Sequence, residues 1–297
     1  MTREVSPLIC VVGQTASGKS ELGLKIAKTW NGEIICADST TIRRGINIGT
    51  AKPNDQQRKC IRHHLVDIIE PDEPFNVARF KKLALQVIQD IVSQGKLPIM
   101  VGGSGLYIDS VLYDYDFVPP SSTVNREELN KLPLAALLVK VQQIGLDITG
   151  VDVKNKRRLI NLIKRNGRQP KKHNLRPHTL LIGIHSANKK ILKRRIEMRL
   201  NDMLEDGLEE EVQKLIAQYG WECEALKGIG YREWREYFLG SINREELCQN
   251  IIQSTMDLAK RQQTWFQRNK SIHWLTAPVS WPVVVDLVTT FLGTEIS

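Results

Sequence analysis

The sequence predicts an α/β fold in which a parallel sheet of the P-loop type is flanked by helices. An apolar run at residues 8–12 leads into the pattern G-x-x-x-x-G-K-[ST], here Gly13-Gln14-Thr15-Ala16-Ser17-Gly18-Lys19-Ser20. Short apolar runs return at 33–37, 97–101 and 179–184, with longer polar or amphipathic segments between them. The composition changes over 115–178, which predicts a small, mostly helical insertion domain.

The glycine-rich loop predicts a phosphate-binding site. Gly13 and Gly18 permit a tight loop whose backbone N–H groups converge on phosphate oxygens. Lys19 supplies a positive charge for the terminal phosphate, and Ser20 offers its hydroxyl to Mg²⁺. Residues 20–28 contain good helix formers, so a bound phosphate would lie at a helix N-terminus. The same pattern without a ligand would be a glycine-rich turn.

Asp38 directly follows the second predicted strand, at 33–37. Because the carboxyl ends of parallel strands face the ligand, this carboxylate is expected beside the glycine-rich loop. The pair Asp38-Ser39 equally suits the cap of a turn or helix, and this stretch alone does not decide between the two. The polar residues 40–62 are predicted as a loop and 63–68 as a third strand.

A helix is expected over 76–93, with Asn76 as its N-cap, and a buried strand at 97–101. Gly102-Gly103-Ser104-Gly105 follows this strand and indicates special backbone angles or close approach of a ligand. In many P-loop nucleotidases a comparable strand ends in an Asp that holds Mg²⁺, and this strand does not. The loop is therefore predicted to bind a diphosphate without hydrolysing a nucleotide.

The insertion is strongly basic. Residues 119–122 are predicted as a linker and 126–143 as an amphipathic helix. The following segment carries ten basic residues and no acidic residue: Lys154, Lys156, Arg157, Arg158, Lys164, Arg165, Arg168, Lys171, Lys172 and Arg176. Such a concentration predicts a polyanionic partner, although a solvated basic face would show the same pattern.

The chain beyond the insertion returns to the α/β pattern. After the strand at 179–184 we expect a second strand at 272–275. Helices are expected at 188–204, 208–219, 244–268 and 281–293. The chain therefore divides into a core, residues 1–114 and 179–297, and the basic insertion, residues 115–178.

Composition limits the remaining possibilities. The 297 residues carry a net charge of +9, and the five Cys form no C-x-x-C pair, which indicates a reducing compartment. No apolar run approaches the roughly 20 residues that a membrane span needs. We expect a cytosolic protein without a membrane partner, acting as a monomer.

Several motifs, taken together and in order, resemble the tRNA dimethylallyltransferase (tRNA isopentenyltransferase) family. Besides the glycine-rich loop and Ala37-Asp38-Ser39, these are I-G-T-A-K-P, G-G-S-G-L-Y, G-I-G-Y-R-E and A-K-R-Q-Q-T-W-F, at 48–53, 102–107, 228–233 and 259–266. The resemblance covers most of residues 8–275. It is far more specific than the glycine-rich loop alone.

The resemblance implies transfer of a dimethylallyl group from dimethylallyl diphosphate to the exocyclic 6-amino group of the adenosine 3′ of the anticodon. It implies that the glycine-rich loop grips the diphosphate, with Lys19 and Mg²⁺ bound by Ser20 stabilising the leaving group. Asp38 matches the general base of the family, and Ser104 stands where the family more often has Thr. Arg232 matches a basic residue near the diphosphate, although an ion pair with a neighbouring Glu would also explain it.

The partner implied is the anticodon stem-loop of tRNA. The residues expected to bind it are Asp38, Ser39, Thr40, Thr41, Ser104, Arg126, Arg157, Arg158, Leu159, Ile160, Asn161, Lys227, Gly228, Ile229, Gly230, Tyr231 and Arg232. The chain departs from the family at Gln14, usually Pro, and at Thr41 and Arg43, usually Gln and Tyr. In the insertion, the family pattern is reduced over 152–164, where Arg158 is retained.

Three other interpretations remain open. An adenylate isopentenyltransferase would prenylate a free nucleotide and would not need the basic insertion. A P-loop small-molecule kinase would need an acceptor pocket and a lid with an arginine for the transition state. A non-catalytic RNA-binding protein with a relic glycine-rich loop would not need Lys19, Ser20 and Asp38 intact.

Overall fold

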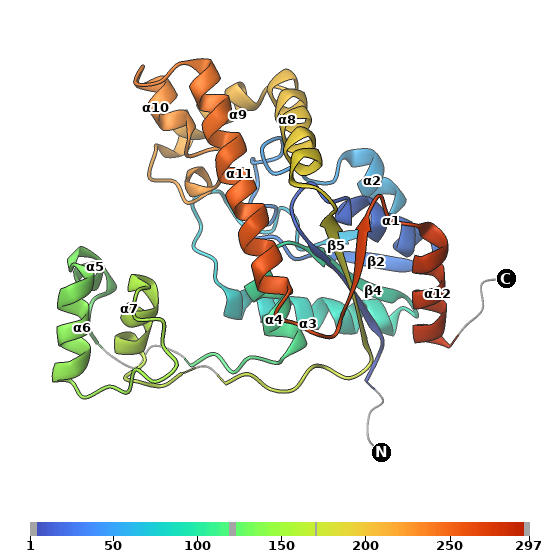
Figure 1. The fold of residues 1–297 in the computed structure, drawn as a ribbon, viewed down its shortest axis with the longest axis horizontal. Coiled ribbons are helices and arrows are strands. Elements are labelled where there is room, and N and C mark those ends of the chain that lie inside the picture. Colours follow the sequence, from blue (N-terminus) through green and yellow to red (C-terminus); the bar gives the residue numbers. More distant parts are fainter. Residues whose placement is uncertain (1–4, 119–122, 170, 294–297) are drawn as a thin grey trace. The chain divides into compact units, whose positions relative to one another are not determined.

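A computed structural model describes residues 5–118, 123–169 and 171–293 of the chain. Its core is a six-stranded parallel sheet of order β3-β2-β4-β1-β5-β6 (Figure 1), which confirms the predicted α/β fold. The strands are β1 (Leu8–Gly13), β2 (Gly32–Cys36), β3 (His63–His64), β4 (Leu97–Gly102), β5 (Thr179–Ser186) and β6 (Ile272–Ala277). β1, β2 and β4 are buried along their full length, as expected for central parallel strands.

The helices of the core follow the strands and connect them in space. They are α1 (Lys19–Thr29), α2 (Asp55–Cys60), α3 (Val77–Ser93), α4 (Gly105–Leu112), α8 (Lys189–Glu205), α9 (Leu208–Tyr219), η1 (Ala225–Lys227), α10 (Trp234–Phe238), α11 (Arg244–Phe266) and α12 (Trp281–Leu292). Asn76 caps α3 by accepting the N–H of Arg79, as the sequence predicts.

Helices cover both faces of the sheet. One apolar cluster joins β1, β2, β4 and β5 to α1 and α12, through residues such as Ile26 and Val284. α3 contacts β2 and β4 with its own buried stripe, which lies outside that cluster, so α3 covers the other face. A second cluster packs α8, α9, α10 and α11 around the fully buried Trp234.

Two predicted elements differ in the structure. The strand expected over 63–68 ends at His64, because Leu65 and Asp67 adopt positive φ angles of 60° and 56°, which extended strands do not allow. The helix expected over 126–143 is divided into α5 (Arg126–Lys131) and α6 (Leu134–Gln143). Pro133 lies between them and forces Leu132 into an extended conformation. The linker predicted at 119–122 lies outside the described residues.

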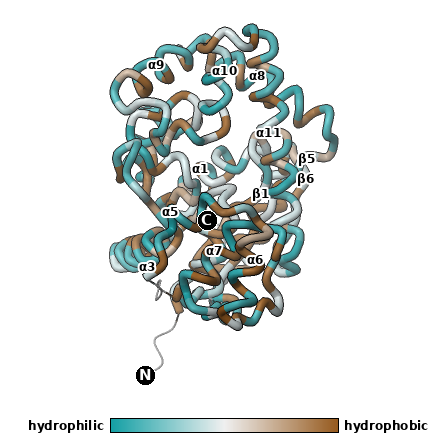
Figure 2. The backbone as a smooth tube through the Cα atoms, turned by 90° about the vertical axis from the view of Figure 1, so that its left-hand side faces the viewer, coloured by the Kyte–Doolittle hydropathy of each residue, from teal (hydrophilic) through white to brown (hydrophobic). Residues whose placement is uncertain are grey.

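The chain forms two compact units, one of residues 1–112 and 176–297 and one of residues 113–175. The second unit contains α5, α6 and α7 (Lys156–Lys164) around a core of its own, which includes Leu137, Leu159 and Ile163. Figure 2 shows apolar and polar segments alternating along α6 and α7, in keeping with helices that bury one side. The helices of the second unit therefore pack on one another and do not depend on the sheet.

Candidate functional site

The glycine-rich loop joins the end of β1 to the start of α1. Gly13 has a φ of 138°, and a Cβ there would lie 2.1 Å from the carbonyl oxygen of Ile184, so no other residue fits. Gly18 caps α1 in the left-handed region, and Ala16 adopts a φ of 57°, which costs a non-glycine residue energy. The loop is therefore held in a special conformation at a helix N-terminus, where an anion is favoured.

Lys19 turns back over this loop and donates a hydrogen bond to the carbonyl of Gln14. Burial lowers the pKa of its ammonium group to about 8, while the Asp38 carboxylate acts in the opposite direction and Arg199 lowers the pKa further. Lys19 and Asp38 therefore interact electrostatically. A second cation, Arg199, belongs to the same cluster.

Asp38 lies just beyond the end of β2 and is half-buried. Its Oδ1 accepts hydrogen bonds from the backbone N–H and the hydroxyl of Thr40, at 2.9 and 2.6 Å. This is the turn-capping arrangement that the sequence also allows. Capping and electrostatic contact with Lys19 therefore occur together, and the turn fixes the position of the carboxylate.

Ser104 supports the same turn from the loop after β4. Its Oγ accepts a hydrogen bond from the backbone N–H of Ser39 at 3.1 Å, and its own N–H donates to the carbonyl of Ala37 at 3.2 Å. The hydroxyl therefore contacts the residue after Asp38. The Ala37–Ser39 turn consequently rests on the loop that follows β4.

Arg199, on α8, belongs to the site and is absent from the sequence-based predictions. Its guanidinium donates to Thr15 Oγ1 and to the carbonyl of Thr50, both at 3.4 Å, and it interacts electrostatically with Asp38. Burial lowers the pKa of Arg199, and Asp38 opposes that effect. Arg199 occurs in a helix rich in basic residues, so no local signal in the sequence separates it from its exposed neighbours.

Among the described residues, five buried polar side-chain atoms have no hydrogen-bond partner: Ser17 Oγ, Trp30 Nε1, Thr41 Oγ1, Arg199 Nε and Gln263 Oε1. Ser17 lies in the glycine-rich loop and Arg199 bonds Thr15 of that loop, so these two atoms are available to a polar ligand there. Beside the loop lies a cavity of about 460 Å³ whose lining includes Ala16, Ser17, Gly18, Lys25, Arg195 and Trp281. Donors and cations around a glycine-rich loop suit a ligand that carries phosphate groups.

The stretch G-I-G-Y-R-E divides into buried and exposed residues. Tyr231 is 1% exposed and donates its hydroxyl to Glu211 at 2.6 Å, so its side chain has a structural role. Arg232 is exposed and pairs with Glu233 at 3.0 Å and with Ser254 at 3.3 Å, which is the ion pair considered from the sequence. Lys227 is also exposed and pairs with Glu224.

The predicted tRNA-contacting residues of the insertion also divide by burial. Arg126, Arg157 and Arg158 are exposed, and Asn161 is half-buried. Leu159 and Ile160 are buried in the core of the second unit, at 0% and 1% exposure. Their side chains therefore hold α7 against its neighbours, and Tyr231 is buried in the same way in the first unit. Contact of these three residues with tRNA stays a prediction.

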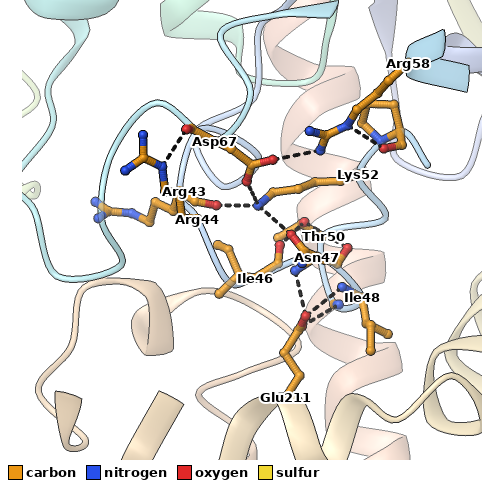
Figure 3. A network of polar contacts seen from close by, with 12 residues as sticks. Arg43, Arg44, Ile46, Asn47, Ile48, Thr50, Lys52, Arg58, Asp67 and Glu211 are labelled. Atoms are coloured by element: carbon orange, nitrogen blue, oxygen red, sulfur yellow. Dashed lines mark hydrogen bonds and ion pairs between the residues drawn. The ribbon is translucent and has the colours of Figure 1, made fainter. Parts of the chain in front are cut away.

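The segment between Asp38 and α2 is fixed by two polar networks, drawn in Figure 3. In one, Lys52 donates to the carbonyl of Arg43 and to Asp67 at 2.5 Å, while Arg58 pairs with Asp67 at 2.8 Å. Arg43, a departure from the family pattern, is buried and donates to the carbonyls of Glu70, Pro71 and Glu73. It is bound within the protein and serves a structural role.

In the second network, Glu211 on α9 accepts the backbone N–H groups of Asn47, Ile48 and Gly49, at 2.7 to 3.2 Å (Figure 3). The hydroxyl of Tyr231 donates to the same carboxylate. These bonds attach the I-G-T-A-K-P segment to the helical layer. Since Thr50 accepts from Arg199, this attachment also sets the position of Arg199.

Gln14 has a structural explanation although the family usually has Pro there. Its Oε1 accepts the N–H of Ser186 at 3.2 Å, and its Nε2 donates to the carbonyl of Ala259 at 3.5 Å. The side chain thus joins the glycine-rich loop to the end of β5 and to α11. A proline would fix the backbone without these two contacts.

The described residues contain neither a cluster of metal ligands nor a helix that could span a membrane. No group of three or more His, Cys, Asp or Glu side chains in that part of the chain is arranged to hold a metal ion. Within the same residues, no helix combines the length and the apolar character needed to cross a membrane.

Comparisons with known proteins agree with one another. A family model described as IPP transferase matches residues 41–269. The tRNA dimethylallyltransferase of Anoxybacillus flavithermus is 38% identical over 278 residues, covering 90% of this chain and 89% of that protein. The tRNA dimethylallyltransferase of Staphylococcus aureus is 35% identical over 302 residues, covering 95% of this chain and 97% of that protein.

Solved structures show the same likeness. The full-length tRNA isopentenylpyrophosphate transferase from Bacillus halodurans is similar with a TM-score of 0.73 and 32% identity, covering 97% of this chain and 95% of that one. A eukaryotic dimethylallyltransferase acting on tRNA has a TM-score of 0.81 at 23% identity, covering 98% of this chain and 81% of that one. The second comparison supports the fold alone.

Proposed function

Because the chain belongs to the IPP transferase family, we propose that it is a tRNA dimethylallyltransferase, transferring a dimethylallyl group from dimethylallyl diphosphate to tRNA. The acceptor is the exocyclic 6-amino group of the adenosine 3′ of the anticodon, and the product is N6-isopentenyladenosine. The observation that supports this proposal is the glycine-rich loop at the N-terminus of α1, whose Lys19 interacts electrostatically with the Asp38 carboxylate fixed by Thr40. A cation suited to a diphosphate and a group that can accept a proton would then act in one site.

The glycine-rich loop and two cations would hold the diphosphate. Lys19 and Arg199 provide positive charge, and the unpaired Ser17 Oγ and Arg199 Nε provide donors that lack partners in the protein. Negative charge grows on the diphosphate as its bond to the dimethylallyl carbon breaks. Fixed positive charge and backbone donors stabilise that change more than they stabilise the bound substrate.

Asp38 would accept the proton that the amine loses as the new C–N bond forms. An exocyclic amine is a weak nucleophile, so a positioned base lowers the barrier. The bonds from Thr40 to Oδ1 fix the carboxylate, and Ser104 fixes the following residue. The adenosine would have to leave the base stack to reach this group.

The donor set also suits Mg²⁺. Ser20 would hold the ion through its hydroxyl, a hard oxygen ligand, and the diphosphate and water would supply the remaining oxygens. When bound, the ion adds positive charge against the departing diphosphate.

The basic insertion would bind the tRNA backbone. Arg157 and Arg158 are exposed at the start of α7, and Arg168, Lys171 and Lys172 are exposed beyond its end. Exposed cations neutralise phosphates and release counterions, which gives affinity without sequence selection. An enzyme that modifies a free nucleotide would not need this segment.

One assay tests the proposal. The protein is incubated with radiolabelled dimethylallyl diphosphate and unmodified tRNA, with AMP and ATP as alternative acceptors in parallel reactions. Label should enter tRNA and be recovered as N6-isopentenyladenosine after digestion. Label in AMP alone would identify an adenylate isopentenyltransferase, and label in no acceptor would refute transferase activity.

A separate prediction concerns the binding of the diphosphate by Lys19. Lys19→Ala should lower kcat/KM at least ~10²-fold, because an uncompensated leaving-group charge costs several kcal/mol. Chelating Mg²⁺ should lower the rate of the wild-type enzyme in the same assay. Lys28→Ala, an exposed lysine on the same helix, is the matched control and should leave the rate unchanged. Normal turnover in both tests would remove the glycine-rich loop from the reaction.

A further inference from the structure

Gln262 on α11 is a buried polar side chain that the mechanism above does not use. It is 8% exposed, and both ends of its amide are hydrogen-bonded. Its Oε1 accepts the backbone N–H of Thr15 at 2.7 Å, and its Nε2 donates to the carbonyl of Gly103 at 3.2 Å. One side chain therefore joins two loops that are distant in the sequence.

One of the two loops is the glycine-rich loop, and the other supports the turn that contains Asp38. Thr15 directly precedes Ala16, whose φ of 57° needs support from its surroundings, within the glycine-rich loop. Gly103 directly precedes Ser104, which accepts the N–H of Ser39 and so supports the turn that contains Asp38. Gln262 thus links Thr15, in the loop that would bind the diphosphate, to Gly103, in the loop that supports the turn containing Asp38.

The fit of this side chain is close. A Cβ at Gly103 would lie only 2.2 Å from Gln262 Nε2, so the absence of a side chain at 103 makes room for the amide. The contact also needs one acceptor and one donor on the same group, since Thr15 offers an N–H and Gly103 offers a carbonyl. A neutral amide supplies both, whereas a carboxylate or a thioether does not.

We propose that Gln262 is a positioning residue that holds the diphosphate loop and the turn bearing Asp38 at a fixed separation. This inference rests on the proposed function, because it assigns the two loops to the two substrates. A displacement of about 1 Å between reacting groups can cost roughly 10²-fold in rate, so a link of this kind affects kcat. Gln262 touches neither the reacting atoms nor Asp38 in this arrangement.

The first test replaces the amide with an apolar group of similar length. Gln262→Met should lower kcat roughly 10- to 100-fold and raise KM for dimethylallyl diphosphate. KM for tRNA should change much less, since the exposed insertion binds the backbone. The matched control is Gln267→Met, at an exposed position just beyond the same helix. Kinetics of the folded variant within twofold of wild type would overturn the proposal.

The second test separates positioning from a loss of folding. Gln262→Glu keeps the shape, and burial should raise the pKa of the new carboxyl group. The protonated form can accept from Thr15 and donate to Gly103, whereas the ionised form cannot donate. The ratio of variant to wild-type kcat/KM should therefore rise severalfold as the pH falls from 8.5 to 6. A Gln262→Glu enzyme as active as wild type at pH 8.5, or a ratio that falls as the pH falls, would contradict the proposal.

Gln262→Met serves as the control for this pH profile, because it has no group at 262 to titrate. Its ratio to wild type should stay constant over the same range. Any pH dependence that the three proteins share cancels in the ratios. The proposed function is tested separately by the wild-type enzyme, since inactivity there with every acceptor would refute the function rather than the role of Gln262.

Discussion

Asp38 combines two roles that are usually considered alternatives. Its Oδ1 caps a turn by accepting two bonds from Thr40, while the carboxylate interacts with Lys19 and Arg199. The turn therefore fixes the carboxylate that we propose as the general base, while its electrostatic interaction with the two cations is kept.

Replacing Asp38 tests this at the level of one residue. Asp38→Asn keeps the shape and can still cap the turn, but it cannot take up the proton, so kcat should fall ~10²- to 10⁴-fold. Affinity for tRNA, measured by filter binding, should change much less. A collapse of tRNA affinity with kcat preserved would instead make Asp38 a purely structural cap.

Arg199 gives a second prediction at this scale. Arg199→Met removes the donors to Thr15 and Thr50 and one cation beside the diphosphate loop, so kcat/KM for dimethylallyl diphosphate should fall ~10²-fold. Arg194→Met, an exposed position on the same helix, is the matched control. For both variants, kcat and KM for dimethylallyl diphosphate are measured at saturating tRNA. Equal values of kcat/KM for the two variants would exclude Arg199 from the site.

The sequence predicts the residues that follow strands better than those on helices. Lys19 could be placed from the G-x-x-x-x-G-K-[ST] pattern that follows β1, and Asp38 because it lies just beyond the carboxyl end of β2. Arg199 and Gln262 lie within long helices, where Arg and Gln are ordinary surface residues. Only the packing of α8 and α11 against the glycine-rich loop brings them to the site. No helix-forming or amphipathic pattern in the sequence predicts that packing.

At the scale of the elements, Glu33 links three strands. It lies in β2, is 3% exposed on its side chain, and pairs with His64 of β3 at 2.6 Å and with Lys96, next to β4, at 2.5 Å. Burial raises the pKa of this carboxyl, but the hydrogen bonds from Lys96 and His64 outweigh it, and the pKa is lowered overall. The ionised form therefore stabilises the edge of the sheet.

Glu33→Gln should destabilise the protein by about 1.5 to 3 kcal/mol at pH 7, the range for hydrogen bonds to charged groups. Because the folded pKa lies below the unfolded one, the difference is complete above the unfolded value of about 4.3. It is lost as the pH falls through the lower folded value. Urea unfolding of both proteins from pH 7 to 3.5 measures this, and a constant difference would contradict the linkage.

Element boundaries show where sequence patterns fail. The strand predicted at 63–68 contains the apolar residues Leu65, Val66 and Ile68. Leu65 and Asp67 nevertheless leave the extended region, and the segment has no glycine that would predict this. In contrast, Pro133 indicates a break inside the helix predicted at 126–143. The amphipathic pattern on both sides of it favoured one continuous helix.

At the scale of the whole molecule, we expect the basic insertion to make tRNA binding sensitive to salt. Neutralising Arg157, Arg158, Arg168 and Lys171 together should weaken tRNA binding and flatten its salt dependence, by about 0.7 to 0.9 in slope per lost phosphate contact. These four are exposed. Lys164 and Arg165 are left unchanged because Lys164 bonds the carbonyl of Val124 and burial lowers the pKa of Arg165.

Filter binding at three salt concentrations measures the slope. The control neutralises four exposed basic residues of the first unit, Lys28, Lys59, Arg62 and Lys270, which makes the same change in net charge. KM for dimethylallyl diphosphate should stay constant in both variants. An unchanged slope in the insertion variant would show that α7 and its flanks form a solvated basic face.

The strand order also has a consequence for synthesis of the chain. β1 lies inside the sheet, paired with β4 on one side and β5 on the other, but β5 follows the whole insertion in sequence. At roughly 5 to 20 residues per second, a ribosome needs several seconds to make residues 113–175. During that time β3, β2, β4 and β1 can assemble while the outer edge of β1 remains unpaired. An open edge invites pairing with other chains, so the delay before β5 is made leaves the nascent core exposed to such pairing.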